Sequence, residues 1–186
     1  MLGPRVARLC IPLILLPDLT YNPSMAYDLR PYEPRDFGAL YRLDQACFPA
    51  GIAYSKSTLR YFLQISGAEC MVAEDAGKIL GFILAEQNDA LAHIITLDVA
   101  ESARRQGLGS ALLRQIEADL ALGGVRTILL ETATNNDSAI AFWKKHGYRI
   151  EAVLKRYYPG KLDAYAMRKI LSSSNRVNAS KAPEEN

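Results

Sequence analysis

The chain has 186 residues, of which 49% are hydrophobic and 23% charged, and its formal net charge is +2. These values are ordinary for one globular domain with a sizeable core, and the small charge gives no reason to expect nucleic-acid binding. The three cysteines, Cys10, Cys47 and Cys70, are odd in number and lack zinc or redox spacing, so we expect a reducing, cytoplasmic location. His93 and His146 lie far apart in the sequence, so we expect no metal site.

The two ends of the chain differ from the middle. An apolar run at residues 9–16 follows two arginines, but prolines interrupt it and it is too short to span a bilayer. We therefore expect residues 1–25 to be a non-structural extension, with targeting as the alternative and Met25 as an alternative start. Residues 172–186 are polar and predict a disordered tail, which leaves 26–171 as the folded domain.

Hydrophobic periodicity predicts strands that alternate with helices along the folded domain. The expected strands lie at 27–31, 70–73, 79–84, 91–99, 127–132, 148–150 and 164–167. The expected helices lie at 35–47, from 55 onward, from a glycine turn to about 122, and at 136–146. Because hairpins occur as well as strand–helix–strand units, the sheet should be mixed rather than fully parallel.

The glycine turn between a strand and a helix predicts an anion site. Its residues are Arg104, Arg105, Gln106, Gly107, Leu108, Gly109 and Ser110. N–H groups at a helix N-terminus lack intrahelical partners, and glycines let the backbone approach a phosphate. The two arginines can add charge-assisted hydrogen bonds, so we expect a pyrophosphate here. The spacing fits neither the dinucleotide fingerprint nor the P-loop, and the alternative is a solvated basic turn.

Glu131 is the candidate catalytic carboxylate. It follows three apolar residues near the end of an expected strand, where a carboxylate costs free energy unless it has a partner or a task. Burial there would raise its pKa and make it a better base near neutral pH. The alternative is a carboxylate that faces solvent at the sheet rim.

Four ordered motifs resemble those of a known family. Residues 104–109 match Arg/Gln-x-x-Gly-x-Gly/Ala, and residues 130–148 resemble Leu-Glu-(x)-Asn-x-x-Ala-(x)-Tyr-(x)-Gly-Phe. The segments 155–159 (KRYYP) and 163–167 (DAYAM) follow. The combination resembles the GNAT-superfamily N-acetyltransferases, and most of all the ribosomal-protein alanine N-acetyltransferase (RimI) type, over about 27–171. It implies an α/β (mixed α+β) GNAT fold: a twisted, mixed, mostly antiparallel sheet of about six to seven strands with about four helices.

The resemblance also implies roles for individual residues, with acetyl-CoA as the cosubstrate and no metal. The backbone of Leu97, Asp98 and Val99 would bind the pantetheine arm as if it were another strand, which requires an unpaired strand edge. The turn at 104–110 would hold the pyrophosphate, Asn136 would hydrogen-bond the cofactor, and Glu131 would act as a base through water. Tyr157 and Tyr158 would line a peptide groove opposite Phe48, Pro49 and Tyr54; ordinary packing is the alternative for these side chains.

The chain departs from the family pattern at Trp143, which we also place against the cofactor. The family usually has a tyrosine there, as general acid for the leaving thiolate. An indole N–H donates a hydrogen bond but is not a usable acid. Because a thiol has a pKa of about 8.5, the thiolate can leave without full protonation. We expect a weakened or redistributed acid role, with Tyr148 and Tyr157 as candidate substitutes.

The pKa values of the two kinds of amine indicate which acceptor is favoured. Deprotonation at pH 7 costs about 1.4 kcal/mol for an α-amine and about 4.6 kcal/mol for lysine, so a site with one base suits the α-amine better. The leading hypothesis is acetylation of a protein or peptide N-terminus, such as that of a ribosomal protein, by direct attack in a ternary complex. The alternatives are acetylation of a small-molecule amine or a protein lysine, and a non-catalytic acetyl-CoA-binding module. We expect no nucleic-acid or membrane partner, and the sequence does not indicate the oligomeric state.

Overall fold

The computed structural model describes residues 27–49 and 51–171. The expected extension and tail, together with Cys10, lie outside these residues. The described residues form one seven-stranded sheet in the order β1-β2-β3-β4-β5-β7-β6, in which only β4 and β5 are parallel neighbours. The strands are β1 (Asp28–Pro31), β2 (Ala68–Asp75), β3 (Lys78–Asn88), β4 (Leu91–Val99), β5 (Thr127–Ala133), β6 (Arg149–Tyr158) and β7 (Leu162–Ile170). The mixed, mostly antiparallel sheet predicted from the sequence is confirmed.

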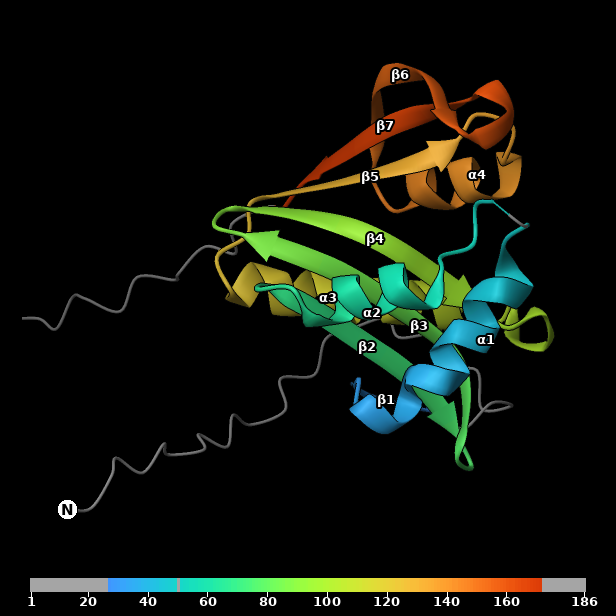
Figure 1. Ribbon diagram of the computed structural model, residues 1–186. Helices are drawn as coiled ribbons and strands as arrows, with labels where there is room; N and C mark the ends of the chain where they lie inside the picture. The colour runs from blue at the N-terminus through green and yellow to red at the C-terminus, as the bar shows by residue number, and fades with distance from the viewer. Residues whose placement is uncertain (1–26, 50, 172–186) are drawn as a thin grey trace, which may run out of the picture.

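Four α-helices accompany the sheet within the described residues: α1 (Phe37–Cys47), α2 (Lys56–Gln64), α3 (Leu108–Leu122) and α4 (Asp137–Lys145). The helices α1 and α2 lie on one face of β2–β4, and α3 and α4 contribute to the core on the other face (Figure 1). Short 3-10 turns η1 (Pro34–Asp36), η2 (Glu101–Ala103) and η3 (Pro159–Lys161) join the elements. Ser55 caps α2 by accepting the Thr58 N–H, as its position before that helix predicts.

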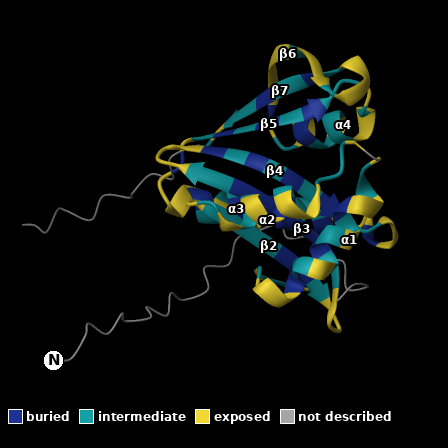
Figure 2. Cartoon of the chain, in the orientation of Figure 1, coloured by how far each residue is buried: buried dark blue, intermediate teal, exposed yellow. Residues whose placement is uncertain are grey.

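The sheet separates two hydrophobic cores, and the buried positions follow the central strands (Figure 2). The larger core lies beneath α3 and α4 and includes Leu112, Leu113, Ile116, Ile128, Leu130, Trp143 and Tyr148. The smaller core lies beneath α1 and α2 and consists of Leu40, Leu59, Val72, Phe82 and Leu84. Side chains of a strand alternate between faces, so the larger core takes Ile128 and Leu130 of β5 and leaves Glu131 on the opposite face.

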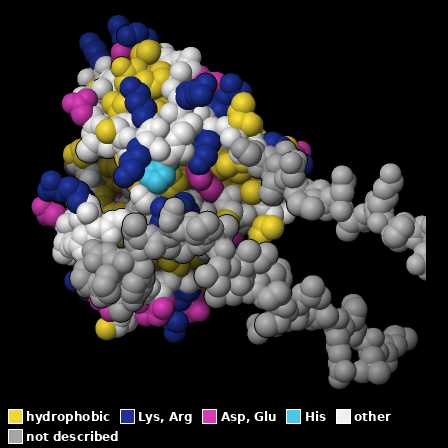
Figure 3. Space-filling model, turned by 180° about the vertical axis from the view of Figure 1, so that it is seen from behind, with side chains coloured by type: hydrophobic (Ala, Val, Ile, Leu, Met, Phe, Trp, Pro, Cys, Tyr) yellow, Lys and Arg dark blue, Asp and Glu magenta, His cyan; other side chains and the backbone are white. Residues whose placement is uncertain are grey.

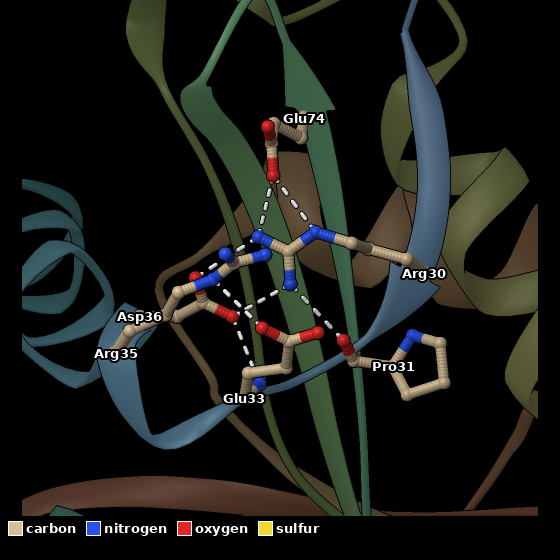
Figure 4. Close-up of polar contacts among 6 residues, drawn as sticks. All are labelled: Arg30, Pro31, Glu33, Arg35, Asp36 and Glu74. Carbon is tan, nitrogen blue, oxygen red and sulfur yellow. Dashed lines mark hydrogen bonds and ion pairs between the residues drawn. The ribbon is translucent and has the colours of Figure 1, made fainter.

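An ionic cluster fixes the short edge strand β1 to the rest of the fold (Figure 4). The Arg30 guanidinium contacts Asp36 at 2.7 Å, and its Nε donates to Glu74 Oε2 at 2.7 Å. Asp36 is only 6% exposed, and its hydrogen bond with Arg30 lowers the pKa of that carboxyl. Arg30 thus links Asp36 of η1 to Glu74 of β2, which holds η1 and the start of α1 against β2.

No helix among the described residues is long and apolar enough to cross a lipid bilayer.

Candidate active site

The parallel pairing between β4 and β5 is short. It joins only Leu91, Ala92 and His93 to residues 127–129, after which the two strands diverge (Figure 1). Within the described chain, residues 94–99 therefore form no ladder with β5. Their backbone groups on that side can pair with an extended ligand. The open edge required for pantetheine binding by residues 97–99 is present, and the binding itself stays a prediction.

The turn that follows β4 is shaped for an anion. Gly107 adopts φ +87° as the N-cap of α3 and, being a glycine, makes no side-chain cap to the first helical N–H groups. A Cβ at Gly107 would meet no atom within 4 Å, so the turn is open at this point. Arg105, which is exposed, also has a positive φ of +58°. Free N–H groups at the positive end of a helix fit the diphosphate predicted from the sequence.

Two polar side chains of the same turn, Arg104 and Gln106, already have partners within the protein. Arg104 Nε donates to the Val99 carbonyl at 2.9 Å, and its Nη2 lies 3.5 Å from Cys47 Sγ. Gln106 donates to the Ser102 carbonyl at 2.8 Å. Arg104 thereby connects the turn to the end of α1. The backbone of the turn and the exposed Arg105 side chain are therefore the parts that are free to meet a phosphate.

The remaining residues of the turn belong to the start of α3. Leu108 is buried in the larger core, and a Cβ built on Gly109 would lie 3.6 Å from Phe142 and from Val99. The Ser110 hydroxyl lies 2.9 Å from His146 Nε2, and burial lowers the pKa of that histidine. This contact ties the anion turn to the C-terminal end of α4.

Glu131 lies on β5 beside the end of the short parallel ladder. Its Oε2 is 2.7 Å from His93 Nε2 on β4 and accepts a hydrogen bond from the Tyr157 hydroxyl at 3.3 Å. Because an ionised carboxylate only accepts, the His93 nitrogen must carry the proton in this contact. The Glu131 side chain is 20% exposed, so solvent reaches it. No pattern in the sequence assigns this role to His93, which is 38 residues from Glu131 in the chain.

The pKa of Glu131 shifts in the direction opposite to the sequence-based expectation. The hydrogen bond with His93 lowers this pKa, and it outweighs the burial that would raise it. Glu131 is therefore a carboxylate at neutral pH. It can accept a proton there, but as a weaker base than a buried glutamate without a partner.

Three tyrosines from two different segments lie near one another beside β4 and β5, and one of them, Tyr157, contacts Glu131. Tyr54, which follows α1, donates its hydroxyl to the Ile95 carbonyl at 3.2 Å, so it lies on the diverging part of β4. Tyr157 and Tyr158 stack edge to face, with ring centroids 5.0 Å apart. Burial raises the pKa of Tyr54, and the nearby Tyr158 and Tyr157 hydroxyls raise it further.

The loop after α1 also approaches the β6–β7 hairpin. A Cβ built on Gly51 would lie 3.9 Å from Pro159, just after Tyr158. Phe48 is half-buried and Pro49 is exposed on this loop. The two segments thus border the opening between β4 and β5, as a peptide groove would require. Contact of Phe48 and Pro49 with a substrate stays a prediction.

Asn136 and Trp143 both have structural roles on α4. The Asn136 side chain accepts the Ala139 N–H at 3.1 Å and so caps the helix, the role that the sequence left open beside cofactor binding. Trp143 is only 7% exposed and packs in the larger core against Phe142 and Tyr148. Little of the indole is free to contact a cofactor, and that contact stays a prediction.

Of the two candidate substitutes for the missing acid, only one lies at the site. Tyr148 is buried in the core, and its hydroxyl donates to Glu117 at 2.9 Å. It is committed to that carboxylate and cannot replace the family's tyrosine. Tyr157 is half-exposed, and its hydroxyl contacts Glu131. Burial and the nearby Glu131 raise its pKa, so it stays protonated at neutral pH.

Two fully buried carboxyl groups lie between β4 and α1. Asp98 accepts the Thr96 hydroxyl at 2.5 Å through Oδ1, but its Oδ2 has no partner in the described structure. Burial raises the pKa of Asp98 to about 7, and Asp44 adds to the shift. Asp44 accepts the Tyr54 N–H at 2.9 Å and so fixes the loop that carries Tyr54. The Asp98 side chain is thus in the interior, and only its backbone is on the open edge.

Positive charge is uneven over the molecule. On the rear face, Lys and Arg side chains gather over the upper part, where β5–β7 lie (Figure 3). Lys144 and Lys145 occupy the last turn of α4, where cations interact favourably with the helix dipole. Among the described residues, no group of three or more His, Cys, Asp or Glu side chains is arranged to hold a metal ion.

Known proteins share this architecture. The acetyltransferase (GNAT) family profile matches residues 37–148, more than half of the chain. An uncharacterized N-acetyltransferase of Methanocaldococcus jannaschii is 30% identical over 75% of this chain and 88% of its own length. An N-alpha-acetyltransferase of Sulfurisphaera tokodaii is 28% identical over 76% and 91%. The crystal structure of the Escherichia coli ribosomal-protein-S18-alanine N-acetyltransferase superposes with a TM-score of 0.72 at 27% identity, covering 81% of this chain and 98% of that one.

Proposed function

This chain belongs to the acetyltransferase (GNAT) family, and we propose that it transfers the acetyl group of acetyl-CoA to the N-terminal α-amine of a protein or peptide. The observation that carries the proposal is the Glu131–His93 pair, which lies beside the diverging β4 and β5 strands and contacts Tyr157. In this proposal the pair supplies a proton acceptor between the open edge of β4, which would take an extended cosubstrate, and the tyrosines that would line the acceptor site. The N-alpha-acetyltransferase among the relatives supports the same acceptor.

The chain offers two features to acetyl-CoA. Backbone groups at 97–99 would pair with the amides of the pantetheine arm, and the N–H groups at 107–110 would bind the pyrophosphate. When bound, the cosubstrate supplies a thioester carbonyl for attack. Both contacts use backbone atoms, so they depend on the course of the strand and the turn more than on particular side chains.

The acceptor amine must lose one proton during transfer. The amine nitrogen forms a bond to the acetyl carbon, the carbon–sulfur bond breaks, and a proton leaves the nitrogen. We assign this proton through water to the Glu131 carboxylate, which the 2.7 Å contact with His93 Nε2 holds in place. An α-amine, with a pKa of about 7.7–8.0, needs only this modest assistance at neutral pH.

The leaving thiolate takes up a proton in the same step or soon afterwards. Tyr157 is the candidate donor, since its hydroxyl is protonated, half-exposed and next to Glu131. Because a thiolate is a good leaving group, we expect Tyr157 to assist rather than control the reaction. A ribosomal protein is a candidate substrate through the E. coli relative, and the cytoplasm is the proposed location.

The test uses a peptide that carries both a free N-terminus and an internal lysine. The peptide is incubated with acetyl-CoA and pure enzyme, and mass spectrometry maps the acetyl group. Glu131→Gln is run in parallel and should reduce kcat/KM for the peptide by about 10²-fold or more, because the amide cannot accept the proton. Acetyl-CoA binding, measured by calorimetry, should be unchanged in this variant.

Each outcome decides between the acceptors. Acetylation of the N-terminus that is lost in Glu131→Gln supports the proposal. Acetylation of lysine overturns the α-amine assignment. Acetyl-CoA binding without acetylation of either amine would indicate a small-amine substrate or a non-catalytic binding protein. Full activity of Glu131→Gln would reject Glu131 as the base.

A further inference from the structure

The β6 strand contains an irregularity directly before Tyr158. Leu154 pairs with Ala164 and Tyr158 pairs with Leu162, so three residues of β6, at 155–157, lie opposite the single residue Asp163 of β7. An antiparallel ladder without a bulge would pair these strands one to one. The extra residues change the direction of the strand at the position from which Tyr157 reaches Glu131.

The bulge requires a strained backbone. Arg156 has φ +56°, in the left-handed region that residues with a Cβ rarely adopt. Such a conformation persists only when surrounding contacts hold it. The Arg156 N–H donates to Asp163 Oδ1 at 2.8 Å, and Lys155 Nζ contacts Asp163 Oδ2 at 2.8 Å. One carboxylate thus holds both residues on the N-terminal side of Tyr157.

The backbone of Asp163 contacts a third segment. Its carbonyl accepts the Thr134 N–H at 3.0 Å and the Thr134 hydroxyl at 3.2 Å, just after the end of β5. Glu131 lies three residues before Thr134 on the same segment. Asp163 therefore links the bulge that carries Tyr157 to the strand that carries Glu131.

We propose that Asp163 is a positioning residue of the acetyl acceptor site, which sets Tyr157 against Glu131 by holding Arg156 in its left-handed conformation. Its carboxylate does not touch the reacting atoms. Loss of this carboxylate frees Arg156 to relax toward ordinary strand geometry, and the Tyr157 hydroxyl then moves away from the acceptor amine. The assignment of this site to the acceptor rests on the proposed function.

The experiment measures kcat and KM for the acceptor and for acetyl-CoA in a set of variants. Asp163→Ala should lower kcat/KM for the acceptor by about tenfold to a hundredfold, the cost of a displaced contact, with the KM for acetyl-CoA unchanged. Asp163→Asn keeps an oxygen for the Arg156 N–H and should retain most activity. Lys155→Ala removes only an exposed ion pair and should change kcat/KM by about twofold or less.

A second substitution separates positioning from general damage. Glycine adopts positive φ without a Cβ penalty, so Arg156→Gly should restore part of the activity lost in Asp163→Ala. A variant whose β6–β7 hairpin is simply disordered would gain nothing from this change. If Asp163→Ala does not fold, Asp163→Glu replaces it, because the longer side chain displaces the oxygen from Arg156.

Two results would overturn the proposal: an unchanged acceptor kcat/KM in Asp163→Ala, or a double variant no better than the single one. The assays use whichever amine the wild-type enzyme acetylates. A lysine or small-amine product therefore rejects the N-terminal assignment and still tests Asp163. If the wild type acetylates nothing, hydrogen exchange at the Arg156 and Tyr157 amides decides: it should accelerate in Asp163→Ala, and no acceleration would reject the assignment.

Discussion

At the scale of single residues, His93 determines the pH range over which Glu131 is ionised. Its hydrogen bond is the largest cause of the lowered pKa of Glu131, and burial acts in the opposite direction. The carboxylate therefore remains ionised to a lower pH than an ordinary glutamate does. Without His93, burial would be opposed mainly by the hydrogen bond from Tyr157.

We predict that His93→Ala raises the pKa of Glu131. The readout is a ¹³C NMR titration of the Glu131 carboxyl, whose midpoint should move to higher pH. His146→Ala is the control, because that histidine contacts Ser110 and not Glu131. A midpoint that stays in place, or moves equally in both variants, would contradict the role given to the His93 contact.

At the scale of elements, we expect anion binding at the turn after β4 to depend mainly on its backbone conformation. Gly107 begins α3 at φ +87°, and a valine there would be strained although no atom lies within 4 Å of its Cβ. We predict that Gly107→Val raises the Kd for acetyl-CoA by about tenfold or more, since backbone strain of this kind costs about 1–3 kcal/mol. Isothermal titration calorimetry measures the change.

The chain contains a matched control for this substitution. Gly77, in the turn between β2 and β3, has φ +81° and also has no atom within 4 Å of a built Cβ. Gly77→Val introduces comparable strain outside the anion turn, so it should reduce stability and leave the Kd unchanged. Equal affinity losses in both variants would show that the effect is global and not specific to the turn.

How far the elements could be predicted depended on their burial. The strand at 91–99 and the helices at 35–47 and 136–146 have one face in the core, so their periodicity was readable. The sequence predicted only 148–150 of β6, which extends over Arg149–Tyr158. This edge strand is exposed along nearly all its length, so no alternation marks it.

The sequence predicted those site residues that lie in the family motif or in a glycine turn. It did not predict contacts that form where strands distant in the sequence meet. Glu131 and the glycine turn follow from local sequence. The contact of His93 with Glu131 depends on the parallel pairing of β4 and β5, which no local pattern reveals. The sequence made Tyr148 a candidate acid. Its burial in the larger core and its contact with Glu117 place it on the other face of the sheet from Glu131.

At the scale of the whole molecule, the buried carboxyl group of Asp98 makes stability depend on pH. Its folded pKa of about 7 is above the value of about 3.9 expected when unfolded, so folding favours the protonated form. Its stabilising contribution is complete below the unfolded pKa and is lost as the pH rises through about 7.

We predict that Asp98→Asn stabilises the protein at pH 8 by about 1–3 kcal/mol, because the variant removes a buried charge with an unpartnered oxygen. The gain should shrink at pH 5, where the wild-type carboxyl is mostly protonated. Urea unfolding at both pH values measures it. Asp75→Asn, at an exposed position at the end of β2, should show no such pH dependence. A gain of equal size at both pH values would contradict the prediction.

The short ladder between β4 and β5 has a consequence for turnover. Three residue pairs join the N-terminal four strands to the C-terminal three, and beyond them each half presents an unfinished edge. A pantetheine chain lying between them would act as an eighth strand and join the two halves by hydrogen bonds. Coenzyme A retains that chain and its pyrophosphate after the acetyl group has gone. Coenzyme A would therefore bind to the two halves about as tightly as acetyl-CoA does. We expect release of coenzyme A, rather than acetyl transfer, to be the rate-limiting step of turnover.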